Sequence, residues 1–441
     1  MRRLIGLLLI LVLTVGLAAG CGKTDGDTGG GATDGGAGGG ATDGGAASDI
    51  VLTYWTHNDE DAWNESDAAM IAAFEAANPG VKIQHEAFPW DEYEAKIMTS
   101  LQSKSGGADI YKIWGGWVLD YADAGVFDPV PDALVSGMIN DCYPPVLGAL
   151  EYNGAYYGLP LEFNAEWGAM LVLKTYFDEH DLSYPDTWAE MIDIAKEHSV
   201  SSGDIFEMRG LDFVSFDTVP YIWLQMILSS GGSYLVDGGT GVDFDTPIAK
   251  ETLQVLIDYL TVYKLTNLDC LTGASESENF NNLFLGEALM APRGMWTIGG
   301  AEEYDMELGV DFDYVATPFY GQKKAWAAET GWSLSVNSAG ANKDAAWKFI
   351  EFMTDPDNLL QINIDCGMIP PRKSVAHDPD YLAAVPHAEP ILNVLDGAQF
   401  IGHFNSDVLK EGICNMVVAI VVEGMGIDDA IAELNDFVSS H

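Results

Sequence analysis

Strand-like and helix-like segments alternate along most of this chain. Residues 50–55 form a β-rich run, and residues 66–77 place apolar side chains on one helical face. An Asn-Pro-Gly sequence at residues 78–80 ends that helix, and extended alternation resumes at residues 81–83. Further along the chain, Thr187 is expected to cap a helix over residues 188–197. Because strands that alternate with helices form mostly parallel sheets, we expect an α/β fold whose ligands lie at the carboxyl ends of strands.

The size and charge of the chain limit its organisation and its partners. Residues 49–441 exceed the length that one hydrophobic core usually supports, so we expect two lobes. The chain has 20 basic and 67 acidic residues, a net charge of −47, and 48% hydrophobic residues, so the charge covers a folded body. This charge repels phosphate groups and excludes a nucleic-acid partner.

The N-terminus has the pattern of an exported protein. Arg2 and Arg3 precede an apolar run over residues 4–17, which is typical of a secretory signal. Residues 17–21 (LAAGC) resemble a bacterial lipobox, so we expect residues 1–20 to be a signal peptide and Cys21 to carry the lipid. An uncleaved single-span anchor and twin-arginine export are the alternatives. Residues 21–48 are rich in Gly, Ala, Thr and Asp, which predicts a flexible linker between the lipid and the body.

Four further cysteines have no metal-ligand spacing. An exported chain can form disulfides, and four cysteines allow up to two bridges in three pairings. Isolated buried thiols are equally compatible with the sequence. These cysteines are Cys142, Cys270, Cys366 and Cys414.

Five short motifs follow one another along the body. They are residues 74–83 (FEAANPGVKI), 157–160 (YGLP), 185–190 (PDTWAE), 284–290 (FLGEALM) and 345–353 (AAWKFIEFM). In this order and spacing the chain resembles the family 1 extracellular solute-binding proteins, the carbohydrate-binding lipoproteins of ABC importers. The resemblance implies a two-lobed fold of the periplasmic-binding-protein type (type II), with a hinge and an interlobe cleft.

The resemblance also implies three chain crossings between the lobes. They are expected near residues 159–165, 290–297 and 331–337. Lobe 1 would then consist of residues 49–160 plus 296–332, and lobe 2 of residues 161–295 plus 333–441.

Tryptophans near strand ends and crossings are the candidate ligand contacts. A sugar has an apolar C–H face and a rim of hydroxyl groups, so it requires aromatic plates and planar hydrogen-bonding side chains. Trp223 resembles an aromatic that stacks on sugar from the second lobe, and core packing is an equal alternative for it. The predicted stacking residues are Trp55, Trp114, Trp223, Trp296 and Trp332.

Polar candidates come from the loops beside these positions. Asn58 and Asp59 follow the first strand, Glu162 and Asn164 follow the first crossing, and Arg293 lies at the second crossing. We expect these side chains to meet sugar hydroxyls. A solvated acidic loop is an equal alternative for residues 57–60.

These observations predict a lipid-anchored, extracytoplasmic receptor for a mono- or oligosaccharide. It would be a monomer that delivers its ligand to ABC permease subunits and their ATPase, with no cofactor, metal or catalytic residue. One alternative is a receptor for a cationic solute such as a polyamine, which an acidic aromatic cleft would bind by cation–π contact. The other is a secreted glycosidase, which needs two opposed carboxyl groups.

Overall fold

A computed structural model describes residues 50–57, 61–102, 107–165, 167–203, 205–213, 218–271, 281–329 and 331–440. The chain from Ser48 onward forms one compact unit. Cys21, Asn58 and Asp59, together with the expected signal peptide and linker, lie outside the described residues. In the described ranges, no helix combines the length and the apolar character needed to span a membrane.

The first strand–helix units form a five-stranded sheet with the strand order β2-β1-β3-β15-β6. β1 pairs in parallel with β2 and β3, whereas β15 is antiparallel to β3 and β6. Consecutive strand–helix units therefore build the parallel part of the sheet. The strand β15, which comes much later in the chain, lies between β3 and β6. The strands are β1 (Ile50–Thr56), β2 (Val81–Ala87), β3 (Ile110–Trp114), β6 (Leu159–Pro160) and β15 (Trp332–Val336).

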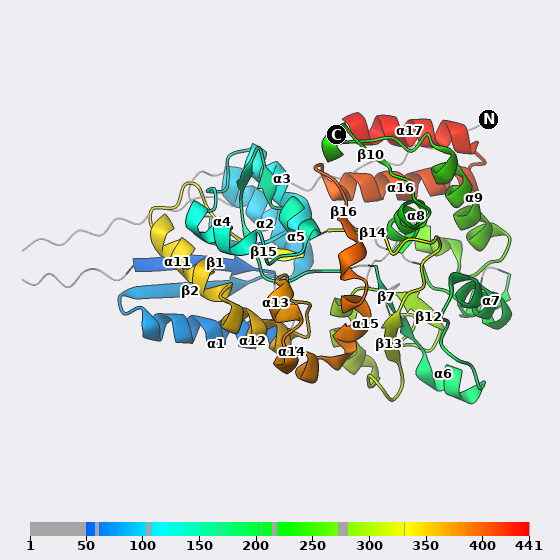
Figure 1. The fold of residues 1–441 in the computed structure, drawn as a ribbon, viewed down its shortest axis with the longest axis horizontal. Coiled ribbons are helices and arrows are strands. Elements are labelled where there is room, and N and C mark those ends of the chain that lie inside the picture. The colour runs from blue at the N-terminus through cyan, green and yellow to red at the C-terminus, as the bar shows by residue number, and fades with distance from the viewer. Residues whose placement is uncertain are drawn as a thin grey trace, which may run out of the picture. The chain divides into compact units, whose positions relative to one another are not determined.

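Side chains along β1 alternate between two cores, one on each face of this sheet. Tyr54 packs with Phe74 and Phe349 on one face, and Trp55 packs with Tyr93 on the other. Helices cover both faces (Figure 1). The first face is covered by α1 (Asp61–Ala77), α11 (Lys343–Met353) and α12 (Pro356–Cys366), and the second by α2 (Trp90–Gln102) and α3 (Gly115–Asp123).

A second, larger core surrounds an antiparallel sheet. Its central strand, β7 (Ala169–Val172), pairs with β12 (Met290–Pro292) and β13 (Asp313–Ala316). The helix α8 (Thr218–Ser229) is buried along its whole length, as expected of a helix that is apolar on all sides. Around it lie the parallel pair β14 (Trp326–Ala328) and β16 (Ala398–Phe400), and the helices α6 (Lys174–Glu179), α7 (Trp188–His198), α9 (Pro247–Thr261), α15 (Glu389–Leu392), α16 (Ser406–Val421) and α17 (Ile427–Ser440).

Short elements connect these parts. The α7 helix begins with a capping box, in which Thr187 and Glu190 each bind a backbone N–H of the other, so the predicted helix start is confirmed. The remaining elements are α4 (Asp132–Met138), α5 (Pro144–Gly148), α13 (Lys373–Ala376), α14 (Pro379–Ala384), the hairpins β4 (Glu151–Tyr152) with β5 (Ala155–Tyr156), β8 (Val200–Ser202) with β9 (Ile205–Met208) and β10 (Leu235–Val236) with β11 (Gly241–Val242), and the 3-10 helices η1 (Asp237–Gly239), η2 (Leu268–Leu271), η3 (Met295–Tyr304), η4 (Pro386–Ala388) and η5 (Leu395–Gly397).

Strand pairing changes the expected division of the chain. Residues 333–441 were expected in lobe 2, yet β15 lies in the first sheet, and α11 and α12 pack on it with Phe349 and Leu359. Residues 296–332 were expected in lobe 1, yet β13 pairs with β7 in the second core. This part of the predicted layout was wrong, because the segment over residues 332–336 is a strand of the first sheet and not a path out of it. The sheets are also less parallel than predicted, since the sheet around β7 is antiparallel.

Three segments that connect the two cores lie side by side. The backbone N–H of Leu161 donates to the carbonyl oxygen of Trp332 at 2.9 Å. The N–H of Phe163 donates to the carbonyl oxygen of Ile369 at 2.7 Å. The connections therefore run near residues 161–163, 331–332 and 369.

The thiols of Cys142 and Cys366 are free. Two bridges would need all four of the cysteines that follow the linker, so this possibility is excluded.

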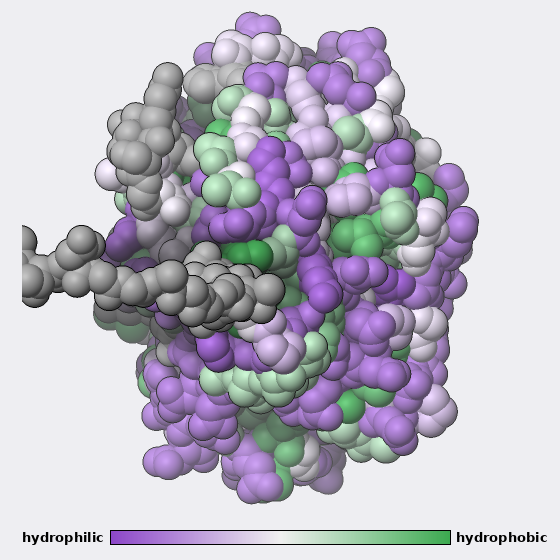
Figure 2. All heavy atoms as spheres, turned by 90° about the vertical axis from the view of Figure 1, so that its left-hand side faces the viewer, coloured by the Kyte–Doolittle hydropathy of each residue, from purple (hydrophilic) through white to green (hydrophobic). Residues whose placement is uncertain are grey.

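The surface agrees with the acidic composition: on the face in Figure 2, hydrophilic residues dominate and hydrophobic residues form small, separate patches.

Candidate functional site

Four tryptophans meet at one end of the five-stranded sheet, and we call Trp55, Trp114, Trp117 and Trp332 the aromatic cluster. The carboxyl ends of the parallel strands β1 and β3 lie at the same edge, and the antiparallel strand β15 begins there. Trp332 is directly opposite Trp114 in the strand register. The ring centroid of Trp332 lies 5.7 Å from that of Trp114 and 6.1 Å from that of Trp117, edge to face in both cases. Three of the predicted tryptophans are thus brought together.

A histidine covers one face of Trp332. His57 follows β1 directly, and its ring stacks on Trp332 with a centroid distance of 3.5 Å and an interplanar angle of 12°. Burial lowers the pKa of His57 well below its ordinary value, and the positive charge of Lys112 lowers that pKa further. The stacked imidazole is therefore neutral near pH 7.

Two lysines lie next to the aromatic rings. Lys112, in β3, is fully buried, and its Nζ lies 3.3 Å from the ring centroid of Trp63 and 5.6 Å from that of Trp332. Lys96, in α2, is exposed, and its Nζ lies 5.2 Å from the ring centroid of Trp55. The aromatic cluster therefore has positive charges beside it, although the chain is strongly acidic.

The predicted polar residues Glu162 and Asn164 lie where β15 begins. Glu162 is buried, and its Oε1 accepts a hydrogen bond from the first backbone N–H of β15 at 3.4 Å. Gly331 has a φ of 122°, and a Cβ there would lie 2.8 Å from the backbone nitrogen of Asn164 and 3.0 Å from Glu162 Oε1. Only glycine fits this position, because it tolerates both the positive φ and the close approach.

Trp296 approaches the same polar residues. It is half-buried in η3, and a Cβ on Gly294 would lie 2.6 Å from its ring and 3.1 Å from Asn164 Oδ1. Asn164 thus lies close to Gly294 and to Gly331, each of which is near a predicted tryptophan. The segments around residues 162–164, 294–296 and 331–332 therefore lie close together.

Residues of the second core contact α3 beside the aromatic cluster. The indole N–H of Trp117 donates to Asp407 Oδ2 at 3.3 Å, and Asn405 Nδ2 donates to Asp120 Oδ2 at 2.8 Å. Burial disfavours the charged form of Asp407, but Lys410, whose Nζ is 2.9 Å from Oδ1, outweighs burial and lowers the pKa of Asp407. Trp117 therefore donates to an ionised carboxylate.

A small cavity lies beside this contact. Its volume is about 10 Å³, and Gly115, Gly116, Glu329 and Ser406 are among the residues that line it. A space of this size holds about one water molecule. The two cores are thus closely packed at this point.

Trp223 does not belong to this site, which corrects the sequence prediction. Its side chain has no exposed surface and stacks on Phe244 with a centroid distance of 4.7 Å. Its indole N–H donates to the carbonyl oxygen of Ala249 at 3.2 Å and to Thr252 Oγ1 at 3.1 Å. Trp223 is a core residue because α8 is buried on all sides.

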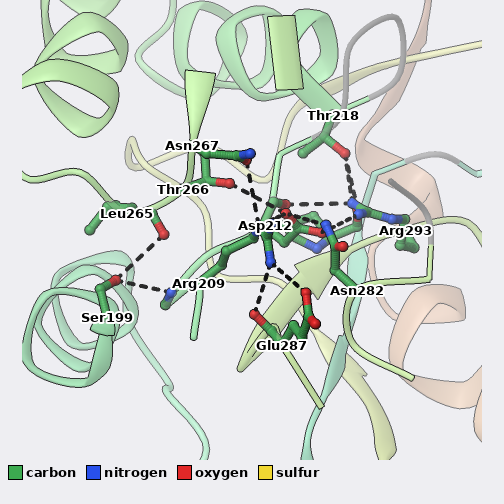
Figure 3. A network of polar contacts seen from close by, with 12 residues as sticks. Ser199, Arg209, Asp212, Thr218, Leu265, Thr266, Asn267, Asn282, Glu287 and Arg293 are labelled. Atoms are coloured by element: carbon green, nitrogen blue, oxygen red, sulfur yellow. Dashed lines mark hydrogen bonds and ion pairs between the residues drawn. The ribbon is translucent and has the colours of Figure 1, made fainter. Parts of the chain in front are cut away.

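Arg293 is also a buried structural residue and not a ligand contact. Its Nη2 lies 2.9 Å from Asp212 Oδ2, and its Nη1 donates to Thr218 Oγ1 at 2.9 Å (Figure 3). Burial raises the pKa of Asp212, while Arg293 and Arg209 favour its carboxylate form. We call Arg209, Asp212, Thr218, Asn282 and Arg293 the Asp212–Arg293 network.

Sequence reasoning missed Lys112. It grouped Trp117 with the other tryptophans at strand ends and His57 with the loop after the first strand, although neither was counted among the predicted contacts. Trp117 follows Trp114 by three residues at a strand end, which is the same signal that predicted Trp114. Lys112 is a lone charge within an otherwise apolar strand, and such an interruption could have marked it. No pattern in the sequence indicates that His57 stacks on a ring 275 positions later along the chain.

Comparison with known proteins places the chain in a family. Residues 69–390 match the model of the bacterial extracellular solute-binding proteins. The chain is 27% identical to the maltotriose-binding protein of Pyrococcus abyssi, over 71% of this chain and 64% of that protein. The match thus spans slightly less than two thirds of that relative's length.

Solved structures share the fold. The GacH receptor of Streptomyces glaucescens has a TM-score of 0.73 at 21% identity, with 89% of this chain and 99% of that chain covered. A solute-binding protein of Thermotoga lettingae, solved with alpha-D-tagatose, has a TM-score of 0.72 at 22% identity and the same coverage. This likeness shows the two-lobed α/β fold, as predicted. Since the family model covers more than half of the chain, the protein belongs to the bacterial extracellular solute-binding proteins.

Proposed function

We propose that this protein captures a mono- or oligosaccharide between its lobes and delivers it to the permease of an ABC importer. Energy for transport would come from the ATPase subunits of that importer. The protein itself performs no chemical step and needs no cofactor. Carbohydrate ligands of relatives support this proposal: one is named for maltotriose, and the GacH receptor was solved in complex with acarbose.

The observation that carries the proposal is the aromatic cluster next to Glu162 and Asn164. One face of a tryptophan, about half of its 150–250 Å², contributes about 2–3 kcal/mol when it is covered by sugar. Two such faces and a few hydrogen bonds of about 1 kcal/mol each reach the roughly 8 kcal/mol of a micromolar complex. Trp332 can supply a face only when the ring of His57 leaves it.

Contact between α3 and α16 supports a mechanism in which ligand binding favours closure. Trp117 belongs to the aromatic cluster and also donates to Asp407 of the second core. A ligand that touches both lobes stabilises the state in which these groups meet. The closed form would then be the form that the permease recognises.

The family is extracellular, so the protein acts outside the cytoplasm. We further propose that it is a monomer held at the membrane by a lipid on Cys21. Residues 21–48 would act as a flexible leash of about 30 Å, and removal of residues 1–20 would accompany lipidation.

Calorimetric titration tests the function. The chain from Ser48 onward, a compact unit, would be titrated with maltotriose, arabinotriose, tagatose, spermidine and single amino acids. We expect at least one sugar to bind with micromolar or tighter affinity. Binding of spermidine with no response to any sugar would replace this proposal with a cation receptor. Release of shorter sugars from an oligosaccharide would indicate a glycosidase.

A further inference from the structure

Lys112 is a buried positive charge beside the aromatic cluster of a strongly acidic chain, where the carboxylates of Glu162 and Asp407 also lie. Lys112 lies in the middle of the five-stranded sheet, and its side chain has no exposed surface. Burial of an ammonium group costs free energy that a methionine in the same space would not cost.

The position of Lys112 gives it an effect on the aromatic rings. Its Nζ lies 3.3 Å from the ring centroid of Trp63 and 5.6 Å from that of Trp332. An indole ring attracts a cation because the potential over its face is negative. A ring that already faces one ammonium group offers less attraction to a second cation, and the two positive charges repel each other.

His57 indicates which kind of ring the face of Trp332 accepts. Its imidazole stacks on Trp332 at 3.5 Å, where the ring of a ligand would lie. After burial, the positive charge of Lys112 is the cause that lowers the pKa of His57. The face of Trp332 thus holds a neutral ring and disfavours its protonated form.

We propose that Lys112 is a specificity-determining residue, which makes the aromatic cluster select neutral ligands and reject cationic ones such as polyamines and amino sugars. The inference rests on the proposed function of the same site and narrows its ligand class to neutral sugars. A chain with a net charge of −47 would then not bind cations at these tryptophans.

Two buried carboxylates make the buried ammonium group tolerable. Glu162 accepts a hydrogen bond from the first N–H of β15, and Asp67 lies in α1 with Oδ2 3.7 Å from His85 Nε2. Lys112, Asp67 and Glu162 all lie close enough to Cys366 to affect the pKa of its thiol. Of these groups, Lys112 has its Nζ 5.6 Å from the ring centroid of Trp332, while Glu162 Oε1 lies 3.4 Å from the backbone nitrogen of that residue.

The test compares affinities for a neutral and a cationic probe. Full-length wild type, Lys112→Met and Lys112→Arg would each be titrated with maltotriose and spermidine at pH 7.5. We expect the ratio of maltotriose affinity to spermidine affinity to fall at least about tenfold in Lys112→Met, the order of magnitude for two unit charges about 10 Å apart at an effective dielectric constant of 20. Lys112→Arg keeps the charge and should keep the wild-type ratio.

Two further variants separate a local effect from a change in total charge. Lys82→Met removes an exposed ammonium group whose partner is Glu75, with Nζ 2.6 Å from Oε2. Lys174→Met removes a surface ammonium group of α6, with Nζ 2.8 Å from Asp178 Oδ2. We expect less than a threefold change of the ratio in both, because solvent and salt screen exposed charges.

The outcomes distinguish this inference from the proposed function. If wild type binds maltotriose and the affinity ratio is the same in Lys112→Met, Lys112 does not set the specificity and the sugar receptor remains. If wild type binds none of the sugars, the proposed function fails. If Lys112→Met does not fold, wild type would be titrated with a maltotriose derivative in which an amino group replaces one hydroxyl. Equal affinity for this derivative and maltotriose would overturn the inference, and affinity at least tenfold weaker would support it.

Discussion

The aromatic cluster and the Asp212–Arg293 network both lie near segments that were predicted to contact ligand, yet they have different roles. The cluster gathers rings at the ends of strands, beside Glu162 and Asn164. The network is sealed inside the second core, where its charged groups satisfy one another. Position near a chain crossing is therefore insufficient evidence for binding. Both regions are buried, so the partners of the polar groups, and not burial, separate the candidate ligand site from the structural network.

The largest expected effect breaks the network. Asp212→Ala removes the carboxylate that lies 2.9 Å from Arg293 Nη2 and leaves a buried guanidinium group without its counter-charge. We expect the free energy of unfolding to fall by about 3–5 kcal/mol, as measured by urea denaturation. Sugar affinity of the folded protein should change less than threefold.

Asp178→Ala is the matched control for that variant. Asp178 is exposed and forms an ion pair with Lys174 at 2.8 Å on the surface of α6. Its removal should cost less than about 1 kcal/mol. If both variants lost the same free energy of unfolding, the buried ion pair of the network would contribute no more to stability than an exposed ion pair.

The second prediction contrasts two tryptophans that were both among the predicted ligand contacts. Trp332→Leu removes an aromatic face from the cluster, so sugar binding should weaken by about 2–3 kcal/mol, roughly 30- to 150-fold by calorimetry. Trp223→Leu should lower the free energy of unfolding by about 2–4 kcal/mol through a cavity while the dissociation constant stays unchanged. Loss of sugar affinity in Trp223→Leu but not in Trp332→Leu would reverse our assignment of the two residues.

Local patterns predicted the elements better than their long-range pairing. The first strand–helix–strand unit, the Thr187 cap and the tryptophans at the ends of β1 and β3 all follow from residues that are adjacent in sequence. The pairing of β15 with β3 joins positions more than 200 residues apart, so the lobe that contains residues 333–368 was assigned incorrectly. The stacking of His57 on Trp332 could not be predicted for the same reason, because the two residues lie far apart in the sequence.

Buried polar residues were the hardest to interpret from sequence. Arg293 looked like a polar contact at a crossing because its partner, Asp212, lies 81 positions earlier in the chain. Trp223 looked available because an isolated aromatic residue does not reveal that its helix is enclosed on every side. Lys112 looked like an ordinary strand residue, since its neighbours Trp63 and Trp332 come from other elements.

The third prediction tests the link between the cluster and the second core. Trp117→Phe keeps an aromatic ring but removes the N–H that donates to Asp407 at 3.3 Å. A hydrogen bond to a charged group contributes about 1.5–3 kcal/mol, and this bond is long, so we expect the lower end, roughly a tenfold loss of sugar affinity in a titration.

Trp347→Phe is the matched control for Trp117→Phe. The Trp347 indole donates to Asp128 Oδ2 at 3.1 Å in the core beneath α11, away from the aromatic cluster. Its replacement should reduce stability and leave sugar affinity unchanged. An unchanged affinity in Trp117→Phe as well would mean that the contact with Asp407 does not form part of ligand-induced closure.

The smallest expected effect concerns the protonation of His57. Because burial and Lys112 hold its pKa in the folded protein well below the unfolded value of about 6.5, the unfolded chain binds a proton that the folded chain does not. The free energy of unfolding therefore falls as the pH drops below about 6.5, by up to about 1.4 kcal/mol per pH unit, and does not depend on this group above that pH.

His57→Gln should remove this loss, so the variant should gain about 1 kcal/mol relative to wild type between pH 7.5 and pH 5.5 in thermal or urea unfolding. His387→Gln should show a gain in the same direction, because burial alone lowers the pKa of His387. Only the gain in His57→Gln should shrink when Lys112 is also replaced by methionine, since Lys112 then no longer disfavours a cation on the face of Trp332.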